Sequence, residues 1–191
     1  MMEIILIRHG RPEFELKGKA RAREVQNIIQ SYDQSGITGT PPDEAAKLAL
    51  SCGAVICSDL RRSLHSAETL GIKDIYKIDS VFREVAIPHF RSGGVTLSVS
   101  AWGAALRIMS VFGFSKNGES LSMARKRAKE ASSYLISVAH AHKRIMLVGH
   151  GFINYFIAKE LLSQNWNGPS KPGKGYWGYG VYRRNESPQG M

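Results

Sequence analysis

The chain has 191 residues, 43% of them hydrophobic and 22% charged, and its 26 Lys and Arg against 16 Asp and Glu give a net charge of +10. This length favours one domain with room for a small cap, and the composition excludes a wholly disordered chain, while no apolar run approaches the roughly 20 residues of a membrane-spanning helix. The basic residues are dispersed rather than gathered in one stripe, so we expect solvated helix faces and no nucleic-acid partner, with attraction of an anionic substrate as the alternative.

Short apolar runs alternate with helical periodicity along the chain. The predicted strands, in chain order, are 3–7, 54–57, 74–78, 145–148 and 176–183. The predicted helices are 19–32, 43–51, 60–70, 98–112, 120–140 and 152–162. We expect residues 81–94 to be mostly irregular, because this stretch holds Pro88 and a Gly pair. The alternation of strands and helices predicts an α/β fold with a mostly parallel central sheet.

Two of the predicted strands are followed by similar short sequences that contain His-Gly. The strand 3–7 runs into Arg8-His9-Gly10, and the strand 145–148 runs into Gly149-His150-Gly151. The carboxyl ends of parallel strands lie at the same edge of a sheet, where ligands bind in open α/β folds. We therefore expect the two histidines to meet at that edge.

The strand between them in sequence brings further polar groups to the same edge. Residues 54–57 lead into Ser58, and Arg61 and Arg62 follow at the start of a predicted helix. A helix that begins there would direct one of the two arginines back toward the histidines. Ser58, Arg8 and one of these arginines are thus expected beside His9 and His150.

Two histidines and two arginines together suit a phosphate dianion. Each guanidinium offers a planar fork that binds two phosphate oxygens. A neutral histidine nitrogen can attack phosphorus and form a covalent intermediate, and a second histidine, when protonated, adds a donor for the oxygens. The leaving oxygen needs a proton, so we expect a carboxyl group or an imidazole to face it.

Each of these residues has a simpler explanation when taken alone. A histidine at a strand end is more often structural, and an arginine in the first turn of a helix more often lies on the surface. Two histidines and a carboxylate could also hold a divalent ion, but the neighbouring arginines would repel it, so we expect no metal ion. Cys52 and Cys57 are predicted to be packed thiols, which fits a reducing, cytoplasmic location.

Four motifs, in order along nearly the whole chain, resemble those of the histidine phosphatase superfamily, whose fold is also called phosphoglycerate-mutase-like. As they stand here, the motifs are Leu6-Ile7-Arg8-His9-Gly10-Arg11-Pro12, Ser58-Asp59-Leu60-Arg61-Arg62-Ser63, Asn117-Gly118-Glu119-Ser120 and Val148-Gly149-His150-Gly151. The resemblance implies a three-layer α/β/α arrangement in which residues 1–191 form a single domain. It also implies a small cap from an insertion, which we place at residues 81–118.

The resemblance implies a role for each residue of the expected pocket. His9 would accept the phosphoryl group as the nucleophile. Arg8, Arg62 and His150 would complete the phosphate pocket. Arg62 is chosen over Arg61 because the arginine of the second motif stands two residues after its leucine.

The resemblance also places the proton donor after the third strand. Phe82-Arg83-Glu84 resembles the family's carboxylate position, so we predict that Glu84 is the donor, ahead of Glu13 and Asp59. The simpler alternative is that Glu84 is a surface residue paired with its neighbour Arg83. Arg11, Glu13 and Ser58 are candidates for contact with the rest of the substrate.

These expectations describe a metal-independent phosphomonoester hydrolase that needs no cofactor and acts on a small phosphorylated substrate. The alternatives are a phosphoglycerate-mutase-type phosphotransferase and a module that binds phosphorylated ligands without turnover. The chain is shorter than typical mutases of this fold, which favours hydrolysis by water. Residues 11–14 depart from the family's usual Thr and Asn, so the substrate stays unassigned, and the sequence makes no prediction of the oligomeric state.

Overall fold

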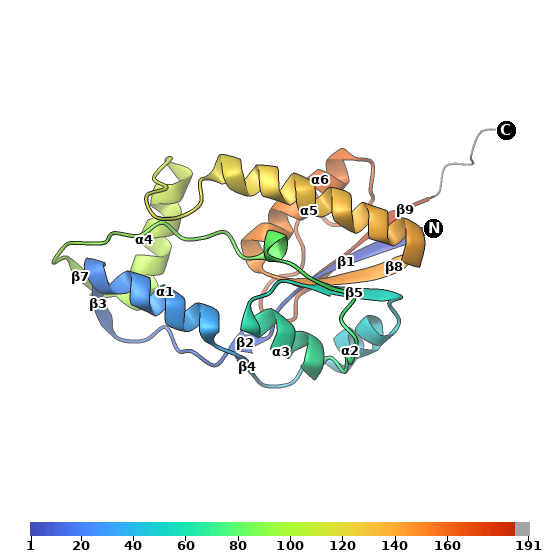
Figure 1. The fold of residues 1–191 in the computed structure, drawn as a ribbon, viewed down its shortest axis with the longest axis horizontal. Coiled ribbons are helices and arrows are strands. Elements are labelled where there is room, and N and C mark those ends of the chain that lie inside the picture. Colours follow the sequence, from blue (N-terminus) through green and yellow to red (C-terminus); the bar gives the residue numbers. More distant parts are fainter. Residues whose placement is uncertain (186–191) are drawn as a thin grey trace.

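A five-stranded sheet forms the centre of the computed structural model, which describes residues 1–185 (Figure 1). Its strands, in spatial order, are β6 (Lys77–Ile78), β5 (Ala54–Cys57), β8 (Arg144–Gly149), β1 (Met2–Arg8) and β9 (Tyr179–Arg184). The first four strands run parallel, and β9 pairs antiparallel with β1. The predicted α/β fold with a mostly parallel sheet is therefore confirmed.

Helices cover both faces of this sheet, which makes three layers (Figure 1). The four covering helices are α5 (Leu121–His142), α6 (Gly151–Ser163), α2 (Asp43–Leu50) and α3 (Arg61–Thr69). The first two pack on one face and the last two on the other. Successive side chains of a strand point to opposite faces, so Leu6 of β1 joins the first core and Ile7 joins the second. Burial on both faces explains why the strands read as unbroken apolar runs.

A smaller group of elements lies beyond the end of the sheet at which the parallel strands finish (Figure 1). Its members are β3 (Lys19–Arg21), a 3-10 turn (Ala22–Glu24), α1 (Val25–Gln34), β7 (Thr96–Ser98) and α4 (Val99–Val111). Strand β3 pairs with β7, and Trp102 Nε1 donates a hydrogen bond of 2.9 Å to the carbonyl oxygen of Ala20. Residues of the segment 81–118 thus pack with residues 19–34, and a capping role for that segment stays a prediction.

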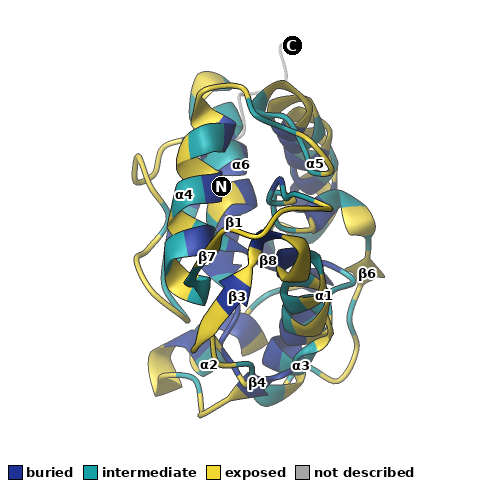
Figure 2. Cartoon of the chain, turned by 90° about the vertical axis from the view of Figure 1, so that its left-hand side faces the viewer, coloured by how far each residue is buried: buried dark blue, intermediate teal, exposed yellow. Residues whose placement is uncertain are grey.

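The remaining elements are short. They are β2 (Arg11–Pro12), its antiparallel partner β4 (Ile37–Thr38) and a 3-10 turn (Ser80–Phe82). In a second view, the helices bury one side and expose another, as their amphipathic patterns require (Figure 2). No helix within residues 1–185 is long and apolar enough to cross a membrane.

Three predicted elements are shorter than the sequence pattern indicates. The predicted helix 19–32 begins only at Val25, because residues 19–21 form a strand in which buried Ala20 alternates with exposed neighbours. The final strand begins at Tyr179 rather than Tyr176, since Trp177 has a φ of 60°, outside the extended region. The weak strand 74–78 contracts to the two residues of β6.

Candidate active site

The carboxyl ends of β1, β5 and β8 bring their following residues to one place. Arg8 is in register with Gly149, and Cys57 is in register with Val148. The next residues, His9, Ser58 and His150, are all buried at this edge of the sheet. The ring centroids of the two histidines lie 5.0 Å apart. The structure therefore brings together the two strand-end histidines, as the His-Gly pair after each of the two strands indicated.

Hydrogen bonding fixes the tautomer of His9. Its Nδ1 lies 2.7 Å from the carbonyl oxygen of Gly10, and because a carbonyl only accepts, Nδ1 carries the hydrogen. The backbone is held as well, since His9 N donates to the Gly149 oxygen at 3.0 Å and Gly10 N donates to Ser66 Oγ at 2.9 Å. Burial, with the nearby charges of Arg62 and Arg8, lowers the pKa of His9 to about 3, against the opposing effect of the bond to Gly10. His9 is thus a neutral imidazole with its lone pair on Nε2.

His150 is neutral for similar reasons. Burial lowers its pKa well below the usual value, and the charge of Arg62 and the neighbouring His9 lower it further. Its Nε2 lies 2.6 Å from Ser58 Oγ. Ser58, predicted to contact substrate, therefore contacts the second histidine. An oxyanion bound beside His150 would favour its protonated form and so give the extra donor that the sequence suggested.

The two adjacent arginines of the second motif differ in burial. Arg62 is 1% exposed, whereas Arg61 is exposed. Within residues 1–185, the buried Nε atoms of Arg62 and Arg8 and the buried Nδ1 of His150 have no hydrogen-bond partner. A buried polar group left unpaired costs about 1–3 kcal/mol. Three such nitrogens around the histidines fit a ligand that accepts several hydrogen bonds, such as a phosphate dianion.

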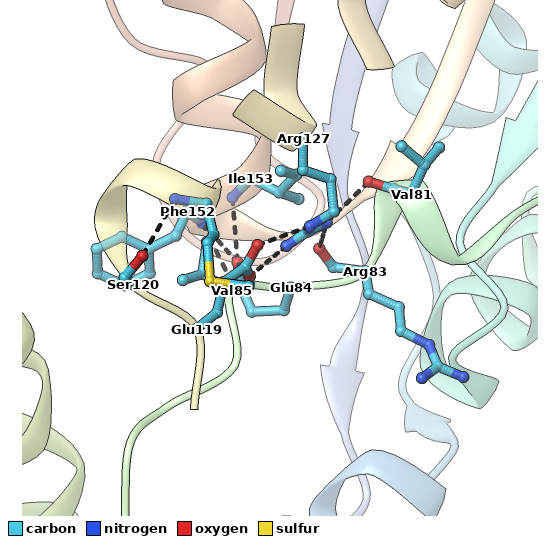
Figure 3. Close-up of polar contacts among 10 residues, drawn as sticks. Val81, Arg83, Glu84, Val85, Glu119, Ser120, Arg127, Phe152 and Ile153 are labelled. Atoms are coloured by element: carbon cyan, nitrogen blue, oxygen red, sulfur yellow. Dashed lines mark hydrogen bonds and ion pairs between the residues drawn. The ribbon is translucent and has the colours of Figure 1, made fainter. Parts of the chain in front are cut away.

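Glu84 lies at the same edge, against the start of α6 (Figure 3). Its carboxylate accepts hydrogen bonds of 3.1 and 3.2 Å from Phe152 N and of 3.1 Å from Ile153 N. A methyl group built on Gly151 would lie 3.7 Å from both Glu84 Oε2 and Arg8 Nε. Glu84 and Arg8 therefore both lie against Gly151, and the carboxylate caps the helix that follows His150.

A partly buried ion pair holds the segment that carries Glu84 (Figure 3). Arg127 of α5 pairs with Glu119 at 2.6 Å and donates from Nη1 to the carbonyl oxygens of Val81 and Arg83 at 2.8 and 2.7 Å. Glu119 belongs to the third of the four sequence motifs. Its carboxylate fixes Arg127, which in turn fixes the backbone on both sides of Phe82 and next to Glu84.

The other two candidate carboxylates differ in their surroundings. Both oxygens of Asp59 accept hydrogen bonds from Arg83, each at 2.6 Å, so Arg83 pairs with Asp59 and not with Glu84. Glu13 is exposed, and a methyl group on Gly36 would lie 3.1 Å from Glu13 Oε2. Arg11 is exposed in β2. The geometry therefore favours Glu84 among the three predicted proton donors.

The structure adds an aromatic residue that the sequence analysis did not single out. The ring of Tyr176 lies 4.6 Å from the guanidinium carbon of Arg8 and 5.8 Å from the ring of His9. Its loop is anchored to β1, because Trp177 N donates to the Arg8 oxygen at 3.1 Å and Arg8 N donates to the Gly178 oxygen at 3.0 Å. Sequence reasoning placed Tyr176 in a strand, and only the fold shows that it faces the histidines.

The buried histidines predict a pH dependence of stability. An unfolded histidine titrates near 6.5, whereas His9 in the folded chain titrates at about 3, so between these values the unfolded state binds the extra proton. The free energy of unfolding should have its highest value above pH 6.5. As the pH falls below 6.5, it should decrease by about 1.4 kcal/mol per pH unit for each histidine. Urea unfolding at about pH 7 and about pH 5 measures this slope.

Two variants separate these histidines from other titrating groups. His150→Gln should reduce the loss of stability below pH 6.5, because one buried histidine is removed. His140→Gln, at an exposed position near the end of α5, should leave the slope as it is in the wild type. Equal slopes in the wild type and in His150→Gln would show that His150 is not held neutral by the fold.

Comparisons with known proteins give a family and a set of similar folds. The family model of the histidine phosphatase superfamily (branch 1) matches residues 4–173. A phosphoserine phosphatase variant from Entamoeba histolytica, in complex with phosphoserine, is 18% identical, with a TM-score of 0.60 over 95% of this chain and 90% of that one. A mycobacterial glucosyl-3-phosphoglycerate phosphatase in complex with VO3 is also 18% identical, with a TM-score of 0.59 over 95% and 92%. A search of curated proteins found no match.

Proposed function

Because the chain belongs to the histidine phosphatase superfamily, we assign it phosphatase activity, and we propose that it hydrolyses phosphomonoesters through a phosphohistidine on His9. One observation carries the proposal. His9 is buried and neutral, with Nδ1 tied to the Gly10 oxygen and Nε2 left as the basic nitrogen, beside the buried guanidinium of Arg62. This is the form of histidine that can attack phosphorus.

In the first step, Nε2 of His9 attacks the phosphorus atom and the bond from phosphorus to the ester oxygen breaks. Arg8, Arg62 and His150 bind the other phosphoryl oxygens, on which charge gathers in the transition state. Glu84, in its protonated form, gives its proton to the departing oxygen, which leaves as an alcohol. The products of this step are phosphohistidine, the alcohol and the Glu84 carboxylate.

In the second step, water attacks the phosphohistidine. The Glu84 carboxylate takes a proton from the water as its oxygen bonds to phosphorus, and the bond between Nε2 and phosphorus breaks. Inorganic phosphate is released, and both His9 and protonated Glu84 are restored. The same donors hold the oxygens in both steps, so the arginines need no rearrangement between them.

Two arginines beside the histidines support a mechanism without a metal ion, because their charges would repel a cation where the phosphate binds. The two similar phosphatases named above act on small phosphomonoesters, and we propose the same broad class of substrate here.

We also propose a cytoplasmic location for the protein. Cys52 and Cys57 are free thiols, and burial raises the pKa of each to about 12, so neither is a reactive thiolate.

Steady-state hydrolysis of 4-nitrophenyl phosphate in the presence of a strong chelator tests this function. We expect turnover that the chelator leaves unchanged, and release of phosphate from a panel of sugar, amino-acid and nucleoside monophosphates identifies the preferred ester. Complete dependence on an added divalent ion would contradict the mechanism. Binding of phosphate without turnover of any ester would favour the non-catalytic module instead.

A further inference from the structure

The guanidinium of Arg62 is held by the last turn of helix α1. Arg62 Nη1 donates to Asp33 Oδ1 at 3.0 Å and to the carbonyl oxygen of Tyr32 at 3.3 Å. The guanidinium carbon also lies 4.6 Å from the centre of the Tyr32 ring. Tyr32 and Asp33 therefore contact one nitrogen and one face of the Arg62 guanidinium, which we propose to bind phosphate.

This contact does not help to attract phosphate. The Asp33 carboxylate adds a negative charge beside the phosphate site and offsets the charge of Arg62, which weakens the attraction for an anion. Its benefit is geometric, because it engages Nη1 and leaves Nε of Arg62 as a buried donor with no partner within residues 1–185. A guanidinium pinned at one nitrogen presents its other donors in a fixed direction.

The pinning residues belong to the smaller group of elements and not to the sheet. Val25 of α1 is buried in the same core as Trp102 and Leu106 of α4, so the position of α1 is set by that group. Arg62 itself lies on α3, which packs on the sheet. Asp33 thus connects the two parts of the molecule at the arginine that we propose to bind phosphate.

The pKa of the Tyr32 hydroxyl is affected by several charged and titratable residues of the site. Burial raises the pKa of the Tyr32 hydroxyl, Arg62 and Arg8 lower it, and Tyr176 and Glu84 raise it. The phenol therefore lies among the charged groups around His9. Its ring covers one face of the Arg62 guanidinium and leaves the in-plane donors for a ligand.

We propose that Asp33 is a positioning residue, which together with the Tyr32 ring fixes the Arg62 guanidinium for the transition state of phosphoryl transfer. This inference rests on the proposed function. An arginine that is free to turn can still bind the ground-state phosphate, whereas the transition state needs its donors at defined places. Loss of the Asp33 carboxylate should therefore lower kcat more than it raises KM.

The test compares Asp33→Ala and Asp33→Asn with the wild type. Asp33→Ala removes both the charge and the acceptor, and it should lower kcat about 10- to 100-fold. Asp33→Asn keeps an acceptor oxygen of the same size, so it should retain more of the activity and should still fold if the alanine variant does not. Asp74→Asn, an exposed carboxylate before β6, is the matched control and should behave as the wild type.

The affinities for two ligands give a second measurement. Their ratio would not change if Asp33 only supported the fold. Vanadate adopts the five-coordinate geometry of the transition state, and inorganic phosphate represents the ground state. Asp33→Ala should weaken vanadate binding by at least about tenfold while phosphate binding changes little or tightens, because a repelling charge is lost. Tyr32→Leu should show the same difference between the two ligands, and Tyr32→Phe, which keeps the ring, should not.

The outcomes separate this inference from the function on which it rests. A wild-type chain that neither hydrolyses phosphomonoesters nor binds vanadate overturns the proposed function, and the inference falls with it. An active wild type with unchanged kinetics in Asp33→Ala overturns the inference alone. Equal weakening of vanadate and phosphate also overturns it, because Asp33 would then support binding in general.

Discussion

Replacing His9 with alanine is expected to lower kcat/KM for 4-nitrophenyl phosphate by at least about a thousandfold, because the nitrogen that accepts the phosphoryl group is lost. The remaining arginines should still bind the substrate, so most of the loss should lie in kcat. Steady-state kinetics of the purified variant measure the change, and its thermal unfolding should show a single transition like that of the wild type.

The matched control for this variant is His140→Ala. His140 lies at an exposed position near the end of α5, at the far end of that helix from Glu119 and the site. We expect wild-type kinetics from it. Turnover by His9→Ala within a few fold of the wild type would show that His9 does not carry the phosphoryl group, whatever the position of its ring.

Glu84→Gln is expected to have the second-largest effect, with a size that depends on the leaving group. General acid catalysis contributes about 100- to 10,000-fold, so hydrolysis of an alkyl phosphate should fall by that order. The loss of kcat/KM for 4-nitrophenyl phosphate should be much smaller, because nitrophenolate leaves without protonation. The comparison is made on kcat/KM, which reports the first step, since kcat also includes the second step, in which Glu84 acts on water whichever ester is used.

Glutamine at position 84 is the informative replacement because it keeps an acceptor oxygen for Phe152 N and Ile153 N. The start of α6 should therefore be preserved. Glu68→Gln, an exposed carboxylate on α3, serves as the control for loss of one negative charge. An equal loss of kcat/KM on both esters would show that Glu84 does not donate the proton to the leaving oxygen.

The positions of the site residues follow from patterns that are local in the sequence. Strands buried on both faces read as apolar runs, so the residue after each run could be placed at the sheet edge. Helical phase then separates Arg62, which is buried with Ser66 one turn later, from exposed Arg61. Trp102 lies with Leu106 in the core of the smaller group, on one face of a helix whose periodicity was visible in the sequence.

Contacts between distant segments could not be predicted in the same way. Asp33 and Arg62 come from two helices that meet only in the folded chain, and neither residue carries a signal of its partner. The pairing of Arg83 with Asp59 could not be predicted from the sequence either, in which a pair between the neighbours Arg83 and Glu84 was the simpler alternative to catalysis by Glu84. Arg83 has backbone angles near those of polyproline II, φ −58° and ψ 153°, in which successive side chains point in different directions, and Arg83 and Glu84 have different partners.

Trapping of the phosphorylated enzyme shows whether His9 carries the phosphoryl group. Rapid quenching of the wild type with a radiolabelled phosphomonoester should give a protein-bound label that is stable in alkali and lost in acid, as for a bond between nitrogen and phosphorus. Peptide mapping should place it on His9, and the His9→Ala variant should take up none. Turnover without labelled protein, or a label that resists acid or persists in His9→Ala, would contradict the account.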